Sequence, residues 1–327
     1  MERIWILSLT PSFKYGRWVI AFVIFLSTYS FQRVYVSEDY QTHSTQLFFS
    51  FLFAYIIPVF SYIIERSGIY FESLRSSASL SDSEFQLLKD SLSRRSTTWV
   101  VTAIGGGLFL AVAQMTLILG SPLNVLASLV GSVSSAATTL TTCLLWVIMT
   151  TILTFLTNNA RTFATLGRDH IDVSILTRRS LLPFGDMSVI STLALIGALA
   201  FFPLMMIEGA SWQQMLPGIL ATGIPMLMLF FTPLWSLHNR LVSTKADELN
   251  KITSRINAEV ISGASPADDA ELLERIVPLL SYQRELGQMS TWPIDMGSMS
   301  RLILYLIIPP LTWVGAALIE NLFDGFM

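Results

Sequence analysis

Charged residues and cysteine are scarce in this sequence. Asp, Glu, Lys and Arg together make up 13% of the 327 residues, whereas hydrophobic residues make up 52%. A soluble domain carries about 25% charged residues, so the composition argues against a soluble globular protein. The single cysteine, Cys143, excludes an intramolecular disulfide. The net charge of −3 is too small to favour a nucleic-acid partner.

The sequence also lacks the residue patterns of catalytic and metal sites. His43, His170 and His238 lie on separate segments, without the spacing of metal ligands. The glycines at 105–107 lack the lysine and the spacing of a phosphate-binding loop. No set of acid, base and nucleophile stands out along the chain. We therefore expect neither an enzyme nor a cofactor or metal.

Long apolar runs dominate the chain instead. A bilayer core about 30 Å thick needs roughly 20 apolar residues per helix. We predict an all-α polytopic membrane protein with seven transmembrane helices. They are expected near residues 18–36, 46–64, 98–120, 127–156, 187–207, 216–237 and 301–320.

The distribution of basic residues predicts the orientation. All Lys and Arg residues except Arg33 precede the first helix or lie in every second connection after it. Because cytoplasmic segments are enriched in Lys and Arg, the N-terminus is expected inside the cell. An odd number of spans then places the C-terminus outside. The expected location is the plasma membrane.

Three parts are expected along the chain. Residues 1–237 would form a six-helix transmembrane bundle with cytoplasmic loops at 65–97 and 157–186. Residues 238–300 read as a cytoplasmic helical hairpin, because apolar residues recur there at helical spacing in a polar background. Residues 301–327 would form the seventh helix and an external tail. The sixth helix is expected to continue into the first arm of the hairpin, which either caps the bundle or assembles subunits.

The seventh helix is the span whose sequence points most directly to a function. Pro309 and Pro310 stand near its middle, so the carbonyls of Tyr305 and Leu306 lose their helical partners. Unpaired carbonyls are costly in lipid, and either a water-filled pore or neighbouring Ser and Thr side chains would satisfy them. The candidate pore and gate residues are Leu306, Pro310, Val314 and Ala317, and those of an acidic, cation-favouring outer mouth are Glu320 and Asp324.

A stripe of small polar residues marks the fourth helix. The spacing of these residues places them on one face of a helix, where they favour close helix packing or a hydrated pocket. They are Ser128, Ser132, Ser135, Thr139 and Thr142.

Aromatic residues gather from Tyr29 through Tyr35 and again in the second helix. We interpret them as an interfacial belt with lipid-facing rings, with the wall of a small-molecule pocket as the alternative. Those in the second helix are Phe48, Phe49, Phe51, Phe53 and Tyr55.

The combined pattern resembles the seven-helix chemoreceptor channels of the gustatory- and odorant-receptor type. The shared features are an inside N-terminus, short outer loops, an extended sixth helix and a split seventh element. Here the split falls between Trp292 and Gly297, and Thr312-Trp313 is similar to the family's signature in the last helix. The resemblance implies a homotetramer, an anchor domain of cytoplasmic helices and a central pore lined by the last helix.

Three hypotheses of function follow. The first is a homo-oligomeric, cation-permeable ion channel, expected to be a tetramer. The second is a membrane-anchored sensory or interaction protein whose hairpin docks a soluble cytoplasmic partner. The third is a lipid or small-solute carrier that uses the groove of the fourth helix. The expected partners are therefore the lipid bilayer, further copies of the chain and inorganic cations.

Overall fold

The fold is built almost wholly from helices. The computed structural model describes residues 2–3, 5–11, 13, 15–37, 41–171, 178–206, 212–262, 270–307 and 311. In these residues the strands β1 (Glu2–Arg3) and β2 (Arg94–Arg95) form a two-residue antiparallel ladder that ties the N-terminal segment to the start of α5. Apart from this ladder, the prediction of an all-α protein is confirmed.

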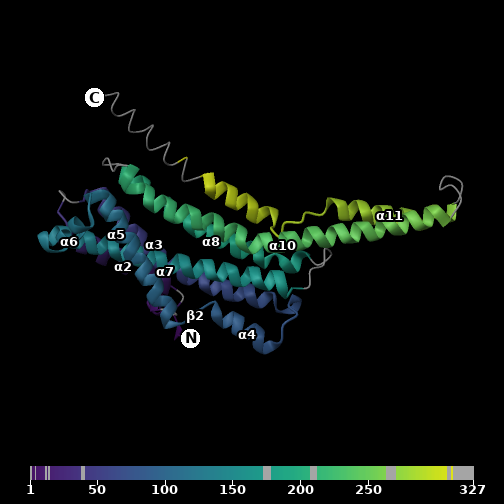
Figure 1. Cartoon of the computed structure of the whole chain (residues 1–327), viewed down its shortest axis with the longest axis horizontal. Coiled ribbons are helices and arrows are strands. Elements are labelled where there is room, and N and C mark those ends of the chain that lie inside the picture. The colour runs from purple at the N-terminus through teal and green to yellow at the C-terminus, as the bar shows by residue number, and fades with distance from the viewer. Residues whose placement is uncertain are drawn as a thin grey trace, which may run out of the picture.

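The helices run mostly along the long axis of the molecule (Figure 1). Their bounds are α1 Trp5–Ser8, α2 Gly16–Tyr35, α3 His43–Ser73, η1 Arg75–Ser77, α4 Asp82–Ser91, α5 Thr97–Leu119, α6 Pro122–Gly131, α7 Val133–Asp169, η2 Arg178–Leu181, α8 Pro183–Leu199, α9 Pro203–Met206, α10 Trp212–Ser262 and α11 Ala270–Gln288.

Six of the described helical segments are long and apolar enough to cross a membrane, as in an integral membrane protein. They are α2, α3, α5, α7, α10 and the segment Pro183–Met205. The expected seventh span is described only in part, as the helix Met296–Ile307. The rest of residues 301–320 lies outside the described residues, except for Leu311.

The interior of the bundle consists of α3, α7 and α8. In their most apolar stretches 61%, 56% and 56% of the residues are buried, against 6% in α2 and 22% in α5. Phenylalanine pairs join these helices edge to face, with ring centroids 5.4 Å apart for Phe60–Phe155 and 5.9 Å apart for Phe163–Phe184. Such pairs add about 0.5–1.5 kcal/mol each to the gain from burial.

Helix α5 packs on this interior through small residues. Its buried positions Ala103, Gly107 and Ala111 recur every four residues on one side of the helix, and Gly107 lies against Val147 of α7. A Cβ atom at Gly107 would lie 2.7 Å from the Cα of Val147, so only glycine allows the two backbones to come this close. Close approach through small residues is the usual way for membrane helices to associate.

The predicted single helix over 127–156 is wrong. The chain breaks at Ser132, whose extended backbone (φ −153°, ψ 161°) ends α6 and begins α7. The side chain of Ser132 accepts a hydrogen bond from the backbone N–H of Ser135, and the side chain of Ser135 accepts one from the backbone N–H of Ser132, which forms a capping box. The predicted helix over 187–207 also divides, into α8 and α9, just before Pro203.

The predicted loops at 65–97 and 157–186 contain much helix. Helix α3 continues to Ser73, with Ser67 and Phe71 on its buried side, and the ring centroid of Phe71 lies 4.9 Å from that of Phe85 of α4. Helix α7 likewise continues to Asp169. The interior helices therefore extend well past the length that a bilayer core requires.

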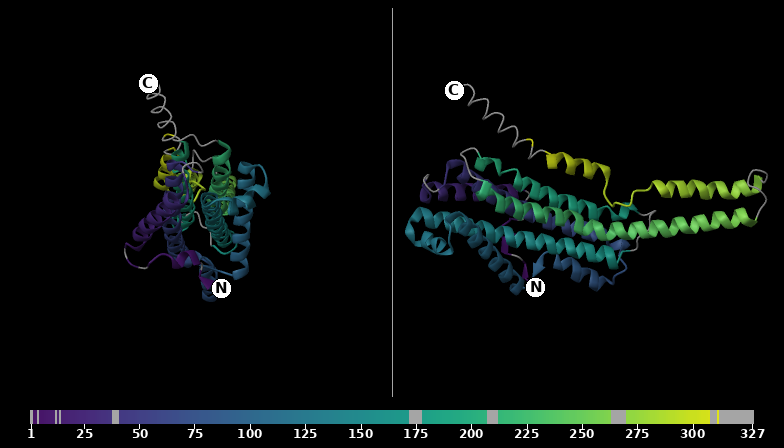
Figure 2. Two further views of the ribbon diagram at one scale, coloured as in Figure 1. Left: turned by 90° about the vertical axis from the view of Figure 1, so that its left-hand side faces the viewer. Right: turned by 45° about the horizontal axis from the view of Figure 1, so that its top comes forward.

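Helix α10 is the longest element, with 51 residues and three internal prolines. The predicted extension of the sixth helix is confirmed as a continuous helix. Its far half packs against α11, with Ile252 and Leu286 buried between them. Lys245 reinforces this contact by donating to the carbonyls of Gly287 and Met289 at 2.7 and 2.8 Å. Figure 2 shows the pair projecting beyond the rest of the bundle.

Candidate ligand cavity

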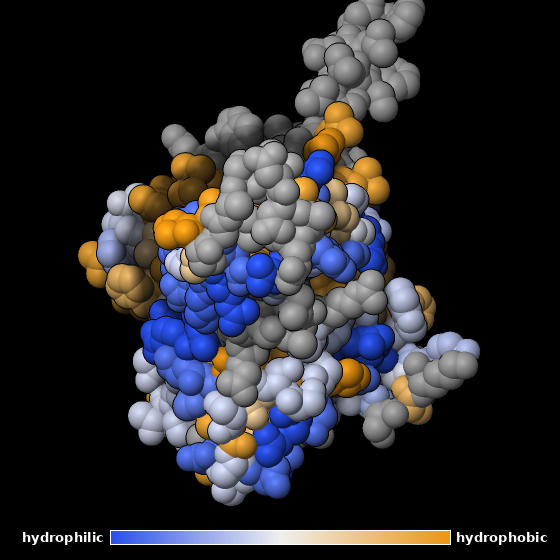
Figure 3. Space-filling model, turned by 90° about the vertical axis from the view of Figure 1, so that its right-hand side faces the viewer, coloured by the Kyte–Doolittle hydropathy of each residue, from blue (hydrophilic) through white to orange (hydrophobic). Residues whose placement is uncertain are grey.

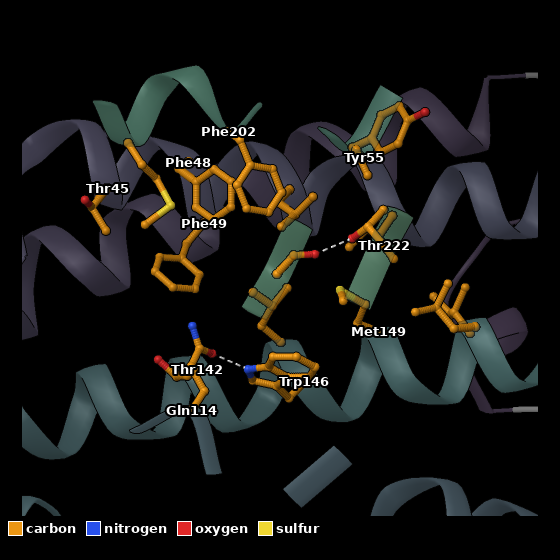
Figure 4. Close-up of a pocket in the computed structure, with 18 of the residues that line it drawn as sticks. Thr45, Phe48, Phe49, Tyr55, Gln114, Thr142, Trp146, Met149, Phe202 and Thr222 are labelled. Carbon is orange, nitrogen blue, oxygen red and sulfur yellow. Dashed lines mark hydrogen bonds between the residues drawn. The ribbon is translucent and has the colours of Figure 1, made fainter. Parts of the chain in front are cut away.

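A cavity of about 420 Å³ lies inside the bundle, between α3, α5, α7, α8 and α10 (Figure 4). Its walls are mainly apolar, and polar side chains gather in part of it. Pockets that hold small organic molecules have volumes of about 300–1,000 Å³ and the same mixture of apolar walls and few polar groups. The size and lining of the cavity therefore suit a small molecule.

One wall of the cavity is aromatic. Phe48 and Phe49 come from α3, and Phe202 comes from the connection between α8 and α9. The ring of Phe48 packs edge to face on both neighbours, at centroid distances of 5.4 Å to Phe49 and 5.1 Å to Phe202. Figure 4 shows the three rings together on one side of the cavity.

These rings correct the interpretation of the aromatic run. Phe48, Phe49 and Phe53 are buried, so they do not face lipid, whereas Phe51 is exposed as predicted. Phe48, Phe49 and Tyr55 line the cavity, in agreement with the alternative of a pocket wall. The reason is that α3 is an interior helix with neighbours on most of its sides.

The opposite wall contains a tryptophan held by a glutamine. The indole N–H of Trp146 on α7 donates to the side-chain oxygen of Gln114 on α5. Both side chains line the cavity, and Trp146 is 6% exposed. The hydrogen bond fixes the indole plane against the cavity and satisfies its only donor.

The predicted polar stripe is shared between two helices instead of following one helix face. Ser128 belongs to α6, Ser132 stands at the break, and the others belong to α7. The hydroxyl of Ser135 donates to the carbonyl of Ser128 at 2.6 Å, and the hydroxyls of Ser128 and Thr139 lie 2.8 Å apart. Four stripe residues also line the cavity, namely Ser128, Ser135, Thr139 and Thr142.

Helix α10 closes one side of the cavity with Gly218 and Thr222. A Cβ atom at Gly218 would lie 2.9 Å from the ring of Phe202, so the glycine lets α10 reach the aromatic wall. The hydroxyl of Thr222 donates to the carbonyl of Gly218 at 2.9 Å. One helix therefore contributes to the cavity and, further along, to the contact with α11.

The segment before Met296–Ile307 is fastened to α8 and α10. The rings of Trp292 and His238 stack with centroids 4.1 Å apart, and a ring nitrogen of His238 lies 3.3 Å from the carbonyl oxygen of Thr291. A Cβ atom at Gly185 would collide with the carbonyl oxygen of Pro293. The start of the last described helix is therefore held by the same α10 that lines the cavity.

A second contact joins α10 to the end of α7. The guanidinium of Arg240 donates from one nitrogen to the carbonyls of Gly167, Arg168 and Ile171, at 3.1, 3.0 and 2.9 Å. A cation at a helix C-terminus also interacts favourably with the helix dipole. Arg240 and His238 thus connect the middle of α10 to the end of α7 and to the segment before Met296–Ile307.

A buried cation lies outside the cavity, at β2. Arg95 is 8% exposed, and burial lowers its pKa to about 10, so it keeps its charge at neutral pH. Its guanidinium donates to Asn159 at 3.0 Å and lies 5.0 Å from the ring centroid of Phe155. Asn159 in turn donates to the carbonyl of Leu92. This network fastens β2 to α7.

Of the predicted pore residues, Leu306 falls within the described part of the chain. Pro310, Val314, Ala317, Glu320 and Asp324 lie outside the described residues. Leu306 is described and is 48% exposed on the helix Met296–Ile307. Its neighbours Ile303, Leu304, Tyr305 and Ile307 are exposed to a similar extent.

Within the described part of the chain, no group of three or more His, Cys, Asp or Glu residues is arranged to hold a metal ion. No protein-family model, curated protein or solved structure matches the chain. The resemblance to chemoreceptor channels therefore stays a prediction.

Proposed function

We propose that this protein is a ligand-responsive membrane channel. A small molecule binds in the cavity, and α10 transmits its presence to the seventh helix, which lines a cation-permeable pore in a homo-oligomer. The observation that carries the proposal is that α10 both lines the cavity and holds the segment that leads into the seventh helix.

The coupling path is short and continuous. Thr222 at the cavity and His238 at the linker are 16 positions apart in one helix, which corresponds to roughly 24 Å at 1.5 Å per residue. A ligand that displaces α10 at Thr222 also displaces His238, and Trp292 is stacked on His238. A channel of this kind needs a cavity and a moving element in contact with the cavity. In this proposal α10 is the moving element.

Exposed apolar surface supports assembly with further copies. The helix Met296–Ile307 exposes about half of each residue from Ile303 to Ile307, and α10 exposes an apolar stripe. The stripe consists of Leu216, Leu220, Ile224, Leu227, Met228, Phe231 and Trp235. In the proposed homo-oligomer neighbouring copies cover part of this surface and lipid covers the rest.

The proposed orientation places the α10–α11 pair in the cytoplasm. The end of the molecule seen in Figure 3 shows much hydrophilic surface. Residues 238–262 and 270–288 contain many charged side chains, whereas membrane-embedded helices carry few. A surface of this polarity belongs in water.

Ligand binding is tested first. Tritiated 1-methylnaphthalene, a small apolar probe, is titrated onto the detergent-purified protein by scintillation proximity. Ala198→Phe places a ring in the cavity from α8 and is expected to weaken binding about tenfold or more, which is about 1.4 kcal/mol. Ala127→Phe, on an exposed position of α6, is the matched control and should bind as the wild type does. Equal affinities of all three proteins would refute binding in the cavity.

Conduction is tested in planar bilayers. Replacing Glu320 by Gln together with Asp324 by Asn should lower cation selectivity, and Leu306→Ala should raise the leak current. An unchanged reversal potential would exclude the acidic residues from the outer mouth. If neither the wild type nor Leu306→Ala conducts with or without the probe, the pore is excluded.

A small-solute carrier is the second candidate, because a binding cavity within the bundle is also what a carrier needs. The two candidates differ in electrical behaviour. Probe flux into liposomes without any current favours the carrier, whereas current that depends on the probe favours the channel.

A further inference from the structure

We propose that the ligand of this cavity is an uncharged molecule with an apolar body and one hydrogen-bond donor, such as a hydroxyl group, which Gln41 and Thr138 recognise. The inference rests on the proposed binding of a small molecule and adds its chemical class. It is carried by two polar atoms that are buried and have no partner, the side-chain oxygens Oε1 of Gln41 and Oγ1 of Thr138. Both side chains line the cavity, and Gln41 is 8% exposed.

The two atoms belong to the same end of the cavity. The backbone N–H of Gln41 donates to the carbonyl of Ser37 at 3.2 Å, and the backbone N–H of Ser37 donates to the hydroxyl of Ser134 at 3.1 Å. Thr138 follows Ser134 by one turn of α7. The start of α3 and the start of α7 are thus joined through Ser37, which brings Gln41 and Thr138 to one side.

The other polar side chains of the described lining already have partners. Thr139 and Thr142 donate to carbonyls one turn earlier in α7, at 2.8 and 3.0 Å. Tyr55 donates to the carbonyl of Ala194 at 3.0 Å, and Thr42 and Thr45 share a hydrogen bond of 3.0 Å. Gln41 and Thr138 therefore stand apart from their neighbours in having hydrogen-bonding capacity left for a ligand.

The chemistry of the two atoms defines what they can recognise. The carboxamide oxygen of Gln41 only accepts hydrogen bonds, whereas the hydroxyl of Thr138 accepts and donates. A buried acceptor without a donor is unfavourable, so a ligand that brings a donor to Gln41 gains more than one that brings an ether or a methyl group. A ligand hydroxyl can donate to Gln41 and accept from Thr138.

The lining excludes a charged ligand. The described residues that line the cavity include no Asp, Glu, Lys, Arg or His. An ion placed among apolar walls loses its hydration and finds no opposite charge to replace it. The apolar body of the ligand instead contacts the rings of Phe48, Phe49 and Trp146.

A matched pair of probes tests the inference. 1-Naphthol carries a hydroxyl donor, and 1-methoxynaphthalene has the same rings and an acceptor but no donor. We expect the wild type to bind 1-naphthol about tenfold more tightly than 1-methoxynaphthalene. Gln41→Met, which keeps the length of the side chain and removes the acceptor, should bring this ratio close to one. Thr138→Val should reduce the ratio in part.

The control is Thr142→Val, because the hydroxyl of Thr142 also lines the cavity but already donates to the carbonyl of Thr138. It should leave the ratio unchanged. Unchanged affinity of Gln41→Met for 1-methylnaphthalene shows that the variant is folded. Equal binding of the two probes by the wild type, or an undiminished ratio in Gln41→Met, overturns the donor site and leaves ligand binding intact. Absence of binding for all three naphthalenes overturns the proposed ligand binding as well.

Discussion

Helices α5 and α7 are nearly equally apolar in their membrane-length stretches, yet 22% of the first and 56% of the second is buried. Burial in this bundle therefore does not follow apolarity. The two helices differ in their polar residues. α7 carries buried Ser135, Thr139, Thr141, Thr151 and Asn159, whereas α5 buries only small residues and Met115.

The comparison shows which groups determine the interior of a membrane bundle. Lipid accepts an apolar face at no cost, so apolar side chains carry no preference for the inside. Polar groups do carry this preference, because lipid cannot satisfy them. In α7 the hydroxyls of Thr141 and Thr151 donate to carbonyls one turn earlier, and the packed neighbours shield them from lipid.

The largest effect is expected from removing a ring at an interior position. Phe155 on α7 is fully buried and packs edge to face on Phe60. Phe155→Ala leaves a cavity and should destabilise the protein by about 3 kcal/mol or more. Phe109→Ala on α5, at a residue 72% exposed, is the control and should cost far less. Unfolding in increasing fractions of SDS measures both, and equal losses would contradict the division into interior and periphery.

A smaller effect is expected at the contact between the two helices. Gly107→Leu forces α5 away from the backbone of Val147 and should cost about 1–3 kcal/mol. Gly105→Leu is the matched control two positions away, because a Cβ atom there meets nothing within 4 Å. The thermal midpoint of the purified protein should fall for the first variant only. A similar midpoint for both variants would mean that α5 does not depend on this close approach.

The smallest effect is expected at α4, a polar helix that belongs neither to the interior nor to the apolar periphery of the bundle. Ser81 and Glu84 form a capping box at its start, and hydrogen bonds from Ser81 lower the pKa of the Glu84 carboxyl below its ordinary value of 4.5. Because the pKa of Glu84 is lower in the folded state, the ionised carboxyl stabilises the fold above pH 4.5. This stabilisation is lost as the pH falls through the lowered pKa.

Ser81→Ala should speed hydrogen exchange of the amides in Asp82–Ser91 at about pH 7, since a lost N-cap costs roughly 1 kcal/mol. The difference from the wild type should shrink as the pH falls through the lowered pKa of Glu84, because the carboxyl is then increasingly protonated in both proteins. Ser91→Ala, at the other end of α4, is the control. A difference that does not depend on pH would show that the Glu84 half of the box contributes nothing.

The membrane character and most of the long helices could be predicted from the sequence. The bounds of α2 and α5 lie within two residues of the predicted runs, because each run has close to the length that a bilayer core requires and stands between more polar segments. The break at Ser132 was also encoded, since a serine followed three residues later by another serine can form a cap. The sequence alone did not reveal this break, because apolar residues continue on both sides of Ser132.

The cavity could not be predicted in the same way. Its walls come from α3, α5, α7, α8 and α10, so it depends on how distant segments meet in space. The aromatic residues Phe48 and Phe49 have the same pattern whether they face lipid or a cavity. Gln41 resembles an ordinary polar residue in a short connection until its burial is known. Periodicity describes one helix at a time, and a cavity is a property of several helices.

The length of α10 has a mechanical consequence. From Thr222 to Ser262 the helix spans 40 positions, or roughly 60 Å, so a tilt of about 5° at the cavity shifts the far tip sideways by roughly 5 Å. A small tilt of α10 at the cavity is thus amplified towards the far tip, in the half of the helix that packs against α11.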